Sequence, residues 1–157
     1  MIYSTATVPV NPAGEVPLTR AQAWAGLVMK ARDARLFLPP GLCAQCDVVE
    51  ESATHIVRDA TIAGDALREI ISFEPERKVS FFQVAGPREG VIVNELFENE
   101  AGELHLRFYC YLGLRGKAPG GSEEQAEQAW MDSDGGYRTA LLSTLKRTRA
   151  LLEEGRL

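Results

Sequence analysis

The chain has 157 residues, of which 45% are apolar and 25% charged, as in ordinary globular proteins, and its formal net charge is −5. The acidic balance argues against a nucleic-acid partner, whose binders carry basic surfaces, and against attachment to an anionic membrane. No apolar run reaches the ~20 residues that a membrane-spanning helix needs, and Met1 to Thr7 lacks the basic start and apolar core of a secretory signal. We therefore expect one cytoplasmic domain over residues 1–157, with its three cysteines reduced.

The first ten residues predict a β-strand. Residues Ile2 to Val10 are rich in β-branched and apolar side chains, and Asn11 to Gly14 form the turn that leads out of the strand.

A helix is predicted to begin at Thr19. The Thr19 hydroxyl can accept a hydrogen bond from the first helical turn, and Gln22 can bond back to it, which makes a capping box. The apolar residues that follow recur at helical spacing; they are Trp24, Leu27, Val28 and Ala31. Asp33 can cap a second, very short helix through Phe37, which Pro39 and Pro40 end.

Between residues 42 and 115 the apolar period changes to two, which predicts six strands. Their ranges are 43–51, 54–62, 66–74, 77–85, 89–98 and 103–115. Short links join consecutive strands as hairpins, so we expect an antiparallel meander.

Ser122 to Glu154 is predicted as one long helix that closes the chain. Ser122 and Gln125 form a second capping box, and Gly155 suits the C-cap. The apolar stripe of this helix consists of Trp130, Tyr137, Leu141, Leu145 and Leu152, widened by Leu142. The Gly135-Gly136 pair either leaves room for a ligand beneath a flexible helix or breaks the helix in two.

This order of elements gives an α+β fold in which helices pack on one face of a curved antiparallel sheet. It resembles the helix-grip fold shared by plant pathogenesis-related allergens, START lipid-transfer domains and polyketide cyclases, the SRPBCC superfamily. Several segments also look like the AtaL-like branch of that superfamily; they are Val8 to Asn11, Leu18 to Trp24, Lys30 to Asp33, Arg58, Leu67 to Glu69, Tyr137, Thr144-Leu145, Arg149 and Glu154 to Leu157. The resemblance implies seven strands wrapped around a long C-terminal helix, two short helices between the first two strands, and an apolar cavity. It implies no particular activity, because carriers, enzymes and sensors share this scaffold.

The hairpin around Ala63-Gly64 suggests an internal ion pair. If these two residues form the turn, Arg58 faces Glu69 on the apolar side of the sheet, and Asp59 faces Arg68 on the solvent side. A buried ion pair is weak evidence of stability, so we hypothesise that Arg58 and Glu69 present polar groups to a ligand. The alternatives are a structural pair at the sheet rim, or a one-residue slip that puts both side chains in water.

The last two strands allow two registers, one with Glu95 pointing inward and the other with Asn94. In either register a polar side chain interrupts an apolar wall, as is usual in small-molecule sites. A buried Glu95 could act as an acid or base, or it could bond to Arg58 or solvent and do no chemistry. Five large side chains are expected either to line the cavity or to fill the core, namely Trp24, Phe73, Phe108, Tyr137 and Leu141.

Cys43 and Cys46 have the spacing of a metal or redox motif, but we expect neither a metal nor a cofactor. A zinc site needs four ligands and the chain has no second pair, and residues i and i+3 of a strand point to opposite faces. His55 and His105 fall on the outer faces of their strands, so we expect them to be solvated.

Three functions remain open. The leading hypothesis is a module that binds an apolar or aromatic small molecule in the internal cavity. The second is a polyketide cyclase or aromatase that uses Glu95 or the Arg58–Glu69 pair in acid–base steps. The third is a structural or interaction domain whose interior is filled.

Overall fold

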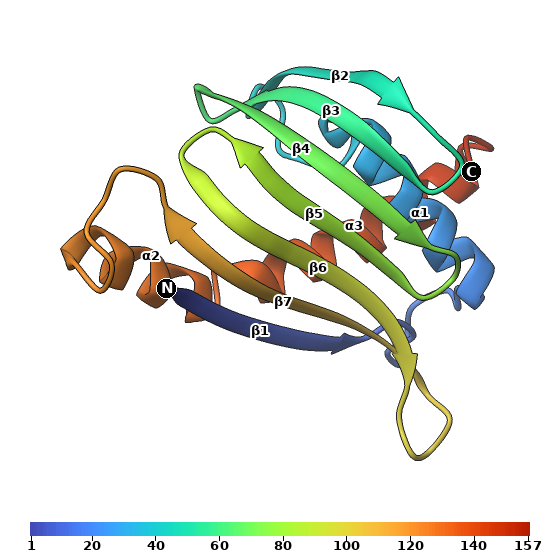
Figure 1. Cartoon of the computed structure of the whole chain (residues 1–157). Helices are drawn as coiled ribbons and strands as arrows, with labels where there is room; N and C mark the ends of the chain where they lie inside the picture. Colours follow the sequence, from blue (N-terminus) through green and yellow to red (C-terminus); the bar gives the residue numbers. More distant parts are fainter.

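The computed structural model describes all residues from 1 to 157, and its centre is a seven-stranded antiparallel sheet (Figure 1). The strands are β1 (Ile2–Pro9), β2 (Cys43–Glu51), β3 (His55–Ile62), β4 (Asp65–Glu74), β5 (Lys78–Ala85), β6 (Arg88–Glu98) and β7 (Leu104–Leu114). Their order in the sheet is β1-β7-β6-β5-β4-β3-β2. The predicted meander from β2 to β7 is confirmed, and β1 adds the seventh strand by pairing with β7.

The helices lie together on one face of the sheet. They are α1 (Arg20–Arg32), the 3-10 turn η1 (Ala34–Leu36), α2 (Ser122–Asp132) and α3 (Tyr137–Glu153). Figure 1 shows the curved sheet in front, with α1 and α3 running behind it. Fully buried side chains of β1 and β7, such as Ile2 and Phe108, meet Leu141 and Leu145 of α3 in one apolar core. The α+β helix-grip prediction is therefore confirmed.

The capping predictions have different outcomes at the two ends of the chain. The Thr19–Gln22 capping box is present at the start of α1, with both reciprocal hydrogen bonds. The second predicted box is wrong, because Ser122 is already the first helical residue and Gly121 occupies the N-cap. The Gln125 side chain bonds instead to the carbonyl of Gly120, at 2.8 Å.

The long C-terminal helix is divided into α2 and α3 by the Gly135-Gly136 pair. The chain folds back so tightly there that a Cβ on Gly136 would lie 2.5 Å from the Met131 carbonyl oxygen. Only a glycine fits this turn without displacing backbone. Trp130 and Leu142 do not belong to the observed apolar stripe, since both are about half exposed, at 49% and 43%.

The prediction that Cys43 and Cys46 point to opposite faces is wrong. A β-bulge between Cys43 and Gln45 adds one residue to β2, so both cysteines are buried on the same side, and both thiols are free. No group of three or more metal-ligating side chains occurs in the structure. No helix of the chain has the length and apolar character required to cross a membrane.

Candidate ligand pocket

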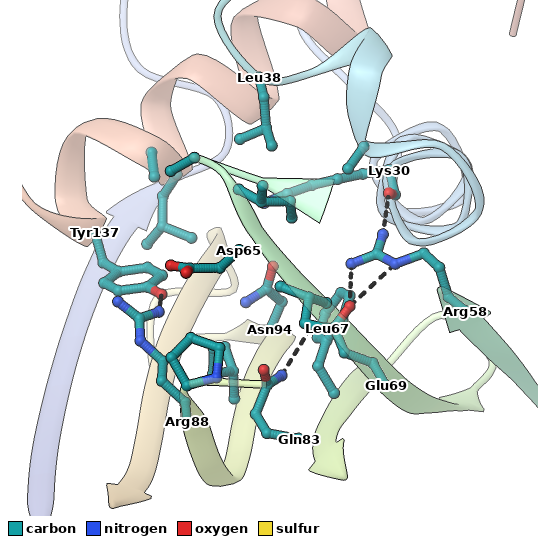
Figure 2. A pocket seen from close by; sticks show the side chains of 18 residues that line it. Lys30, Leu38, Arg58, Asp65, Leu67, Glu69, Gln83, Arg88, Asn94 and Tyr137 are labelled. Carbon is teal, nitrogen blue, oxygen red and sulfur yellow. Dashed lines mark hydrogen bonds and ion pairs between the residues drawn. The ribbon is translucent and has the colours of Figure 1, made fainter. Parts of the chain in front are cut away.

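A pocket of about 300 Å³ lies between the inner face of the sheet and helices α1 and α3 (Figure 2). It lies next to the tips of the β3–β4 and β5–β6 hairpins and is partly open to solvent. Ten of its 18 lining residues are hydrophobic. The lining residues are Lys30, Ala34, Leu38, Arg58, Ile62, Ala63, Asp65, Leu67, Glu69, Phe81, Gln83, Pro87, Arg88, Ile92, Asn94, Tyr137, Ala140 and Leu141.

One polar wall of the pocket is the Arg58–Glu69 pair. The predicted register is confirmed, since Arg58 and Glu69 are direct cross-strand partners and only 4% and 5% exposed. The Arg58 Nε–H donates to Glu69 Oε2 at 3.0 Å, and Arg58 Nη2 donates to the same oxygen. Gln83 Nε2 donates to the second Glu69 oxygen at 2.7 Å. Both carboxylate oxygens are therefore hydrogen-bonded within the protein.

Arg58 also joins the sheet to α1. Its Nη1 donates to the carbonyl oxygens of Lys30 at 3.2 Å and Ala31 at 2.8 Å, in the last turn of that helix. Carbonyls in the last turn of a helix lack partners inside the helix, so Arg58 supplies two of the missing hydrogen bonds. The pair thus has a structural role at the position where sequence analysis expected a ligand contact. On the other face of the same hairpin, Asp59 and Arg68 form the expected solvent-exposed pair.

The opposite side of the pocket carries Arg88 and Tyr137 (Figure 2). Arg88 donates to the Tyr137 hydroxyl at 3.3 Å and forms an ion pair with Glu127 of α2. The Tyr137 ring stacks on Phe108 of β7, with centroids 3.8 Å apart and planes 3° apart. Burial of the phenol raises the pKa of Tyr137 above its usual value, although the charge of Arg88 opposes the shift. Tyr137 is therefore a neutral hydroxyl at physiological pH.

Two polar groups in the pocket have few partners within the protein. Asn94 on β6 is 4% exposed, and its side-chain amide makes no hydrogen bond to the protein. Lys30 on α1 makes one side-chain hydrogen bond, from Nζ to Thr144 Oγ1 at 3.1 Å, and no ion pair. Burial and the nearby charge of Arg58 lower the pKa of Lys30 to about 8, with Glu69 acting in the opposite direction.

Of the eight residues proposed from sequence, four line the pocket, three pack in or against the core, and Glu95 points outward. Arg58, Glu69, Tyr137 and Leu141 line the pocket. Trp24, Phe73 and Phe108 pack in or against the apolar core outside it, with the Trp24 and Phe73 rings in an edge-to-face arrangement at 6.3 Å.

The inward placement of Glu95 is wrong. β6 and β7 adopt the other of the two registers, in which Asn94 pairs with Phe108 and points inward. Glu95 then points to the outer face, because successive strand residues alternate, and it forms an ion pair with Arg107 at 2.6 Å.

Sequence reasoning missed Lys30, Gln83 and Arg88 as pocket residues. Lys30 lies three residues after Leu27 and so next to the apolar stripe of α1, a position that could have drawn attention to it. Arg88 has the same strand parity as Asn94, so the correct register alone would have placed it inward. Gln83 has the same strand parity as Phe81, but alternation alone left open whether Phe81 or Phe82 faces inward.

Comparisons with known proteins agree with this architecture. A model of a protein family described as AtaL, acetylaranotin biosynthesis cluster protein L, matches residues 4–155. A comparison with curated protein sequences found no match.

Among solved structures, the chain is similar to Ara h 8.0201, with a TM-score of 0.64 and 10% identity over 94% of this chain and 97% of that one. It is similar to the ZhuI aromatase/cyclase of a Streptomyces species, with a TM-score of 0.58 and 15% identity over 97% and 92% of the two chains. It also resembles StfQ, a di-domain aromatase/cyclase of the steffimycin biosynthetic pathway, with a TM-score of 0.62 and 13% identity over 98% of this chain and 51% of StfQ. At these identities the likeness is one of fold.

Proposed function

This chain belongs to the AtaL family, and we propose that it binds an apolar or aromatic small molecule in the pocket between the sheet and helices α1 and α3. The observation that carries the proposal is the Asn94 amide, which faces this pocket and makes no hydrogen bond to another protein group. The donor and acceptor atoms of this amide remain accessible from the pocket, so a ligand there can hydrogen-bond to them. Apolar walls with a few convergent polar groups are the usual form of a small-molecule site.

The size of the pocket limits the ligand. Small-molecule sites generally measure roughly 300–1,000 Å³, so a pocket of about 300 Å³ suits a compact molecule of two or three rings. The proposal includes a cytoplasmic location, which the three free cysteines support. It includes no nucleic-acid partner, because the net charge is −5.

The test is a fluorescence titration with N-phenyl-1-naphthylamine, a neutral dye with an aromatic body. The wild-type protein should give saturable binding. Replacement of Ala140, which lines the pocket, by Trp should weaken binding at least tenfold, because the indole fills the space that the dye needs. The matched control is Ala129→Trp, on the exposed side of α2, which should bind the dye as the wild type does. Equal binding by both variants, or no saturable binding by the wild type, would contradict the proposal.

A second candidate is an enzyme that cyclises or aromatises a polyketide-like substrate. Lys30 favours it, since a lysine with a pKa of about 8 can accept a proton near neutral pH. The carboxylates considered from sequence support it less, because Glu69 is fully engaged and Glu95 faces outward. In this function Lys30→Met should abolish turnover of a poly-β-ketone substrate while Glu95→Gln leaves turnover unchanged. Loss of activity in Glu95→Gln would contradict this assignment.

A further inference from the structure

Resting on the proposed ligand pocket, we propose that the ligand carries an anionic oxygen group, a carboxylate or an ionised enol, and that Lys30 binds it. Lys30 is not part of the predicted polar pair, and its ammonium group is the positive charge in the pocket for which the protein supplies no carboxylate. The proposal assigns one end of the pocket to the charged group and the remaining apolar walls to the body of the ligand.

The position of Lys30 is set by the packing of α1 against α3. Its Nζ donates to Thr144 Oγ1, and that hydroxyl in turn donates to the Ala140 carbonyl at 2.9 Å. Thr144 lies one turn beyond the pocket residues Ala140 and Leu141 on the same helix. An ammonium group carries three N–H donors, so two remain for a ligand in the pocket.

The two arginines that line the pocket are compensated. Arg58 is paired with Glu69, whose second oxygen is occupied by Gln83, and Arg88 is paired with Glu127. Asp65 lies at the exposed rim of the pocket and forms no ion pair with Lys30, Arg58 or Arg88. Lys30 is thus the one cation of the pocket that has no ion pair. Partly desolvated charges are stable when they are paired, and an anionic ligand would supply the negative charge that pairs with the Lys30 ammonium.

Because Lys30 titrates, the affinity for an anionic ligand should depend on pH. Burial and the charge of Arg58 bring the pKa of Lys30 to about 8 in the free protein. A bound anion favours the charged ammonium, so the pKa in the complex lies higher than in the free protein. Binding of the anion should therefore be constant below pH 8 and weaken by up to tenfold per pH unit above it, until the pKa of the complex is reached. Tyr137 carries no charge in this range, because burial raises its pKa.

The experiment compares two pairs of probes that share a body and differ in charge. One pair is 2-naphthoate and 2-naphthamide, and the other is 2-hydroxy-1,4-naphthoquinone, ionised at neutral pH, and 2-methoxy-1,4-naphthoquinone. At pH 6.5 the anionic member of at least one pair should bind about tenfold more tightly than its neutral partner. The pair that shows the preference distinguishes a carboxylate ligand from an enolate ligand.

The Lys30→Met variant should lose the preference for the anion and keep the affinity for the neutral probe. Lys146→Met is the matched control, since it removes an exposed lysine of α3 and the same unit of charge, and it should retain the preference. Lys30→Met removes an unpaired, partly buried charge, so its unfolding temperature should equal or exceed that of the wild type. The pH dependence of the wild type needs no variant and checks the same assignment.

The outcomes separate this inference from the proposed function. Neutral probes that bind without any preference for the anions overturn the role of Lys30 and leave the ligand pocket in place. A preference that persists in Lys30→Met, or anion binding that does not change between pH 7 and 9.5, also overturns it. If neither member of either pair binds, the ligand pocket and the inference fall together.

Discussion

Replacing Arg58 by methionine should lower the free energy of unfolding by about 3–5 kcal/mol, the usual effect of removing one partner of a buried ion pair. The Glu69 carboxylate would remain 5% exposed with only Gln83 as a partner, and two carbonyls in the last turn of α1 would lose their donor. Urea denaturation followed by circular dichroism measures the change, through the denaturation midpoint at constant slope.

The same hairpin provides the control for this experiment. Arg68→Met breaks the Asp59–Arg68 pair, which joins the same two strands on the exposed face, and should change stability by less than about 1 kcal/mol. The double variant Arg58→Met/Glu69→Met should recover much of the loss, because it leaves no unpaired charge behind. Equal effects of Arg58→Met and Arg68→Met would show that burial does not set the value of these pairs.

Gly26→Ala should destabilise the protein by about 1–3 kcal/mol, the usual range for overpacking. On helix propensity alone the same change would stabilise the protein by about 1 kcal/mol, so the sign of the effect is diagnostic. The reason is the close approach of α1 and α3, where a Cβ on Gly26 would lie 2.2 Å from Thr148 Oγ1 and 2.7 Å from its Cγ2. Thermal and urea unfolding of the purified variant check this expectation.

A double-mutant cycle with Thr148→Ala tests the cause of the Gly26 effect. Alanine at 148 removes the two atoms that make the closest contacts, so Gly26→Ala should cost less in that background than in the wild type. The same loss in both backgrounds would mean that the contact with Thr148 is not responsible. The contact matters for the pocket as well, because α1 carries Lys30 and α3 carries Tyr137.

These two contacts explain how the pocket persists beside a packed core. Arg58 attaches the last turn of α1 to β3, and Gly26 allows the middle of α1 to pack closely on α3. Phe108, at the centre of β7, is fully buried beneath Tyr137 and so ends the core where the pocket begins. The pocket lies between these contacts and the tips of the β3–β4 and β5–β6 hairpins.

The local pattern of the sequence determined the strands and most of their pairing. Strand alternation and turn chemistry are short-range properties, so the β3–β4 register, with Arg58 opposite Glu69, followed from the Ala63-Gly64 turn. The placement of Arg58 and Glu69 on the inner face of the sheet followed from the apolar residues that share this face of the two strands. The capping box at Thr19 was readable for the same reason, since it involves residues three positions apart.

Tertiary structure decided what the local pattern left open. The short link before β7, predicted over residues 99–102 and observed over 99–103, permitted two registers. Only packing of the whole sheet selected the register with Asn94 inward and Glu95 outward. The bulge that brings Cys43 and Cys46 to one side depends on the pairing of β2 with β3, which alternation alone does not show. Whether large side chains fill the interior or surround a space depends on how far apart the helices and the sheet lie. That separation is fixed by contacts between distant residues such as Gly26 and Thr148, which a linear pattern does not contain.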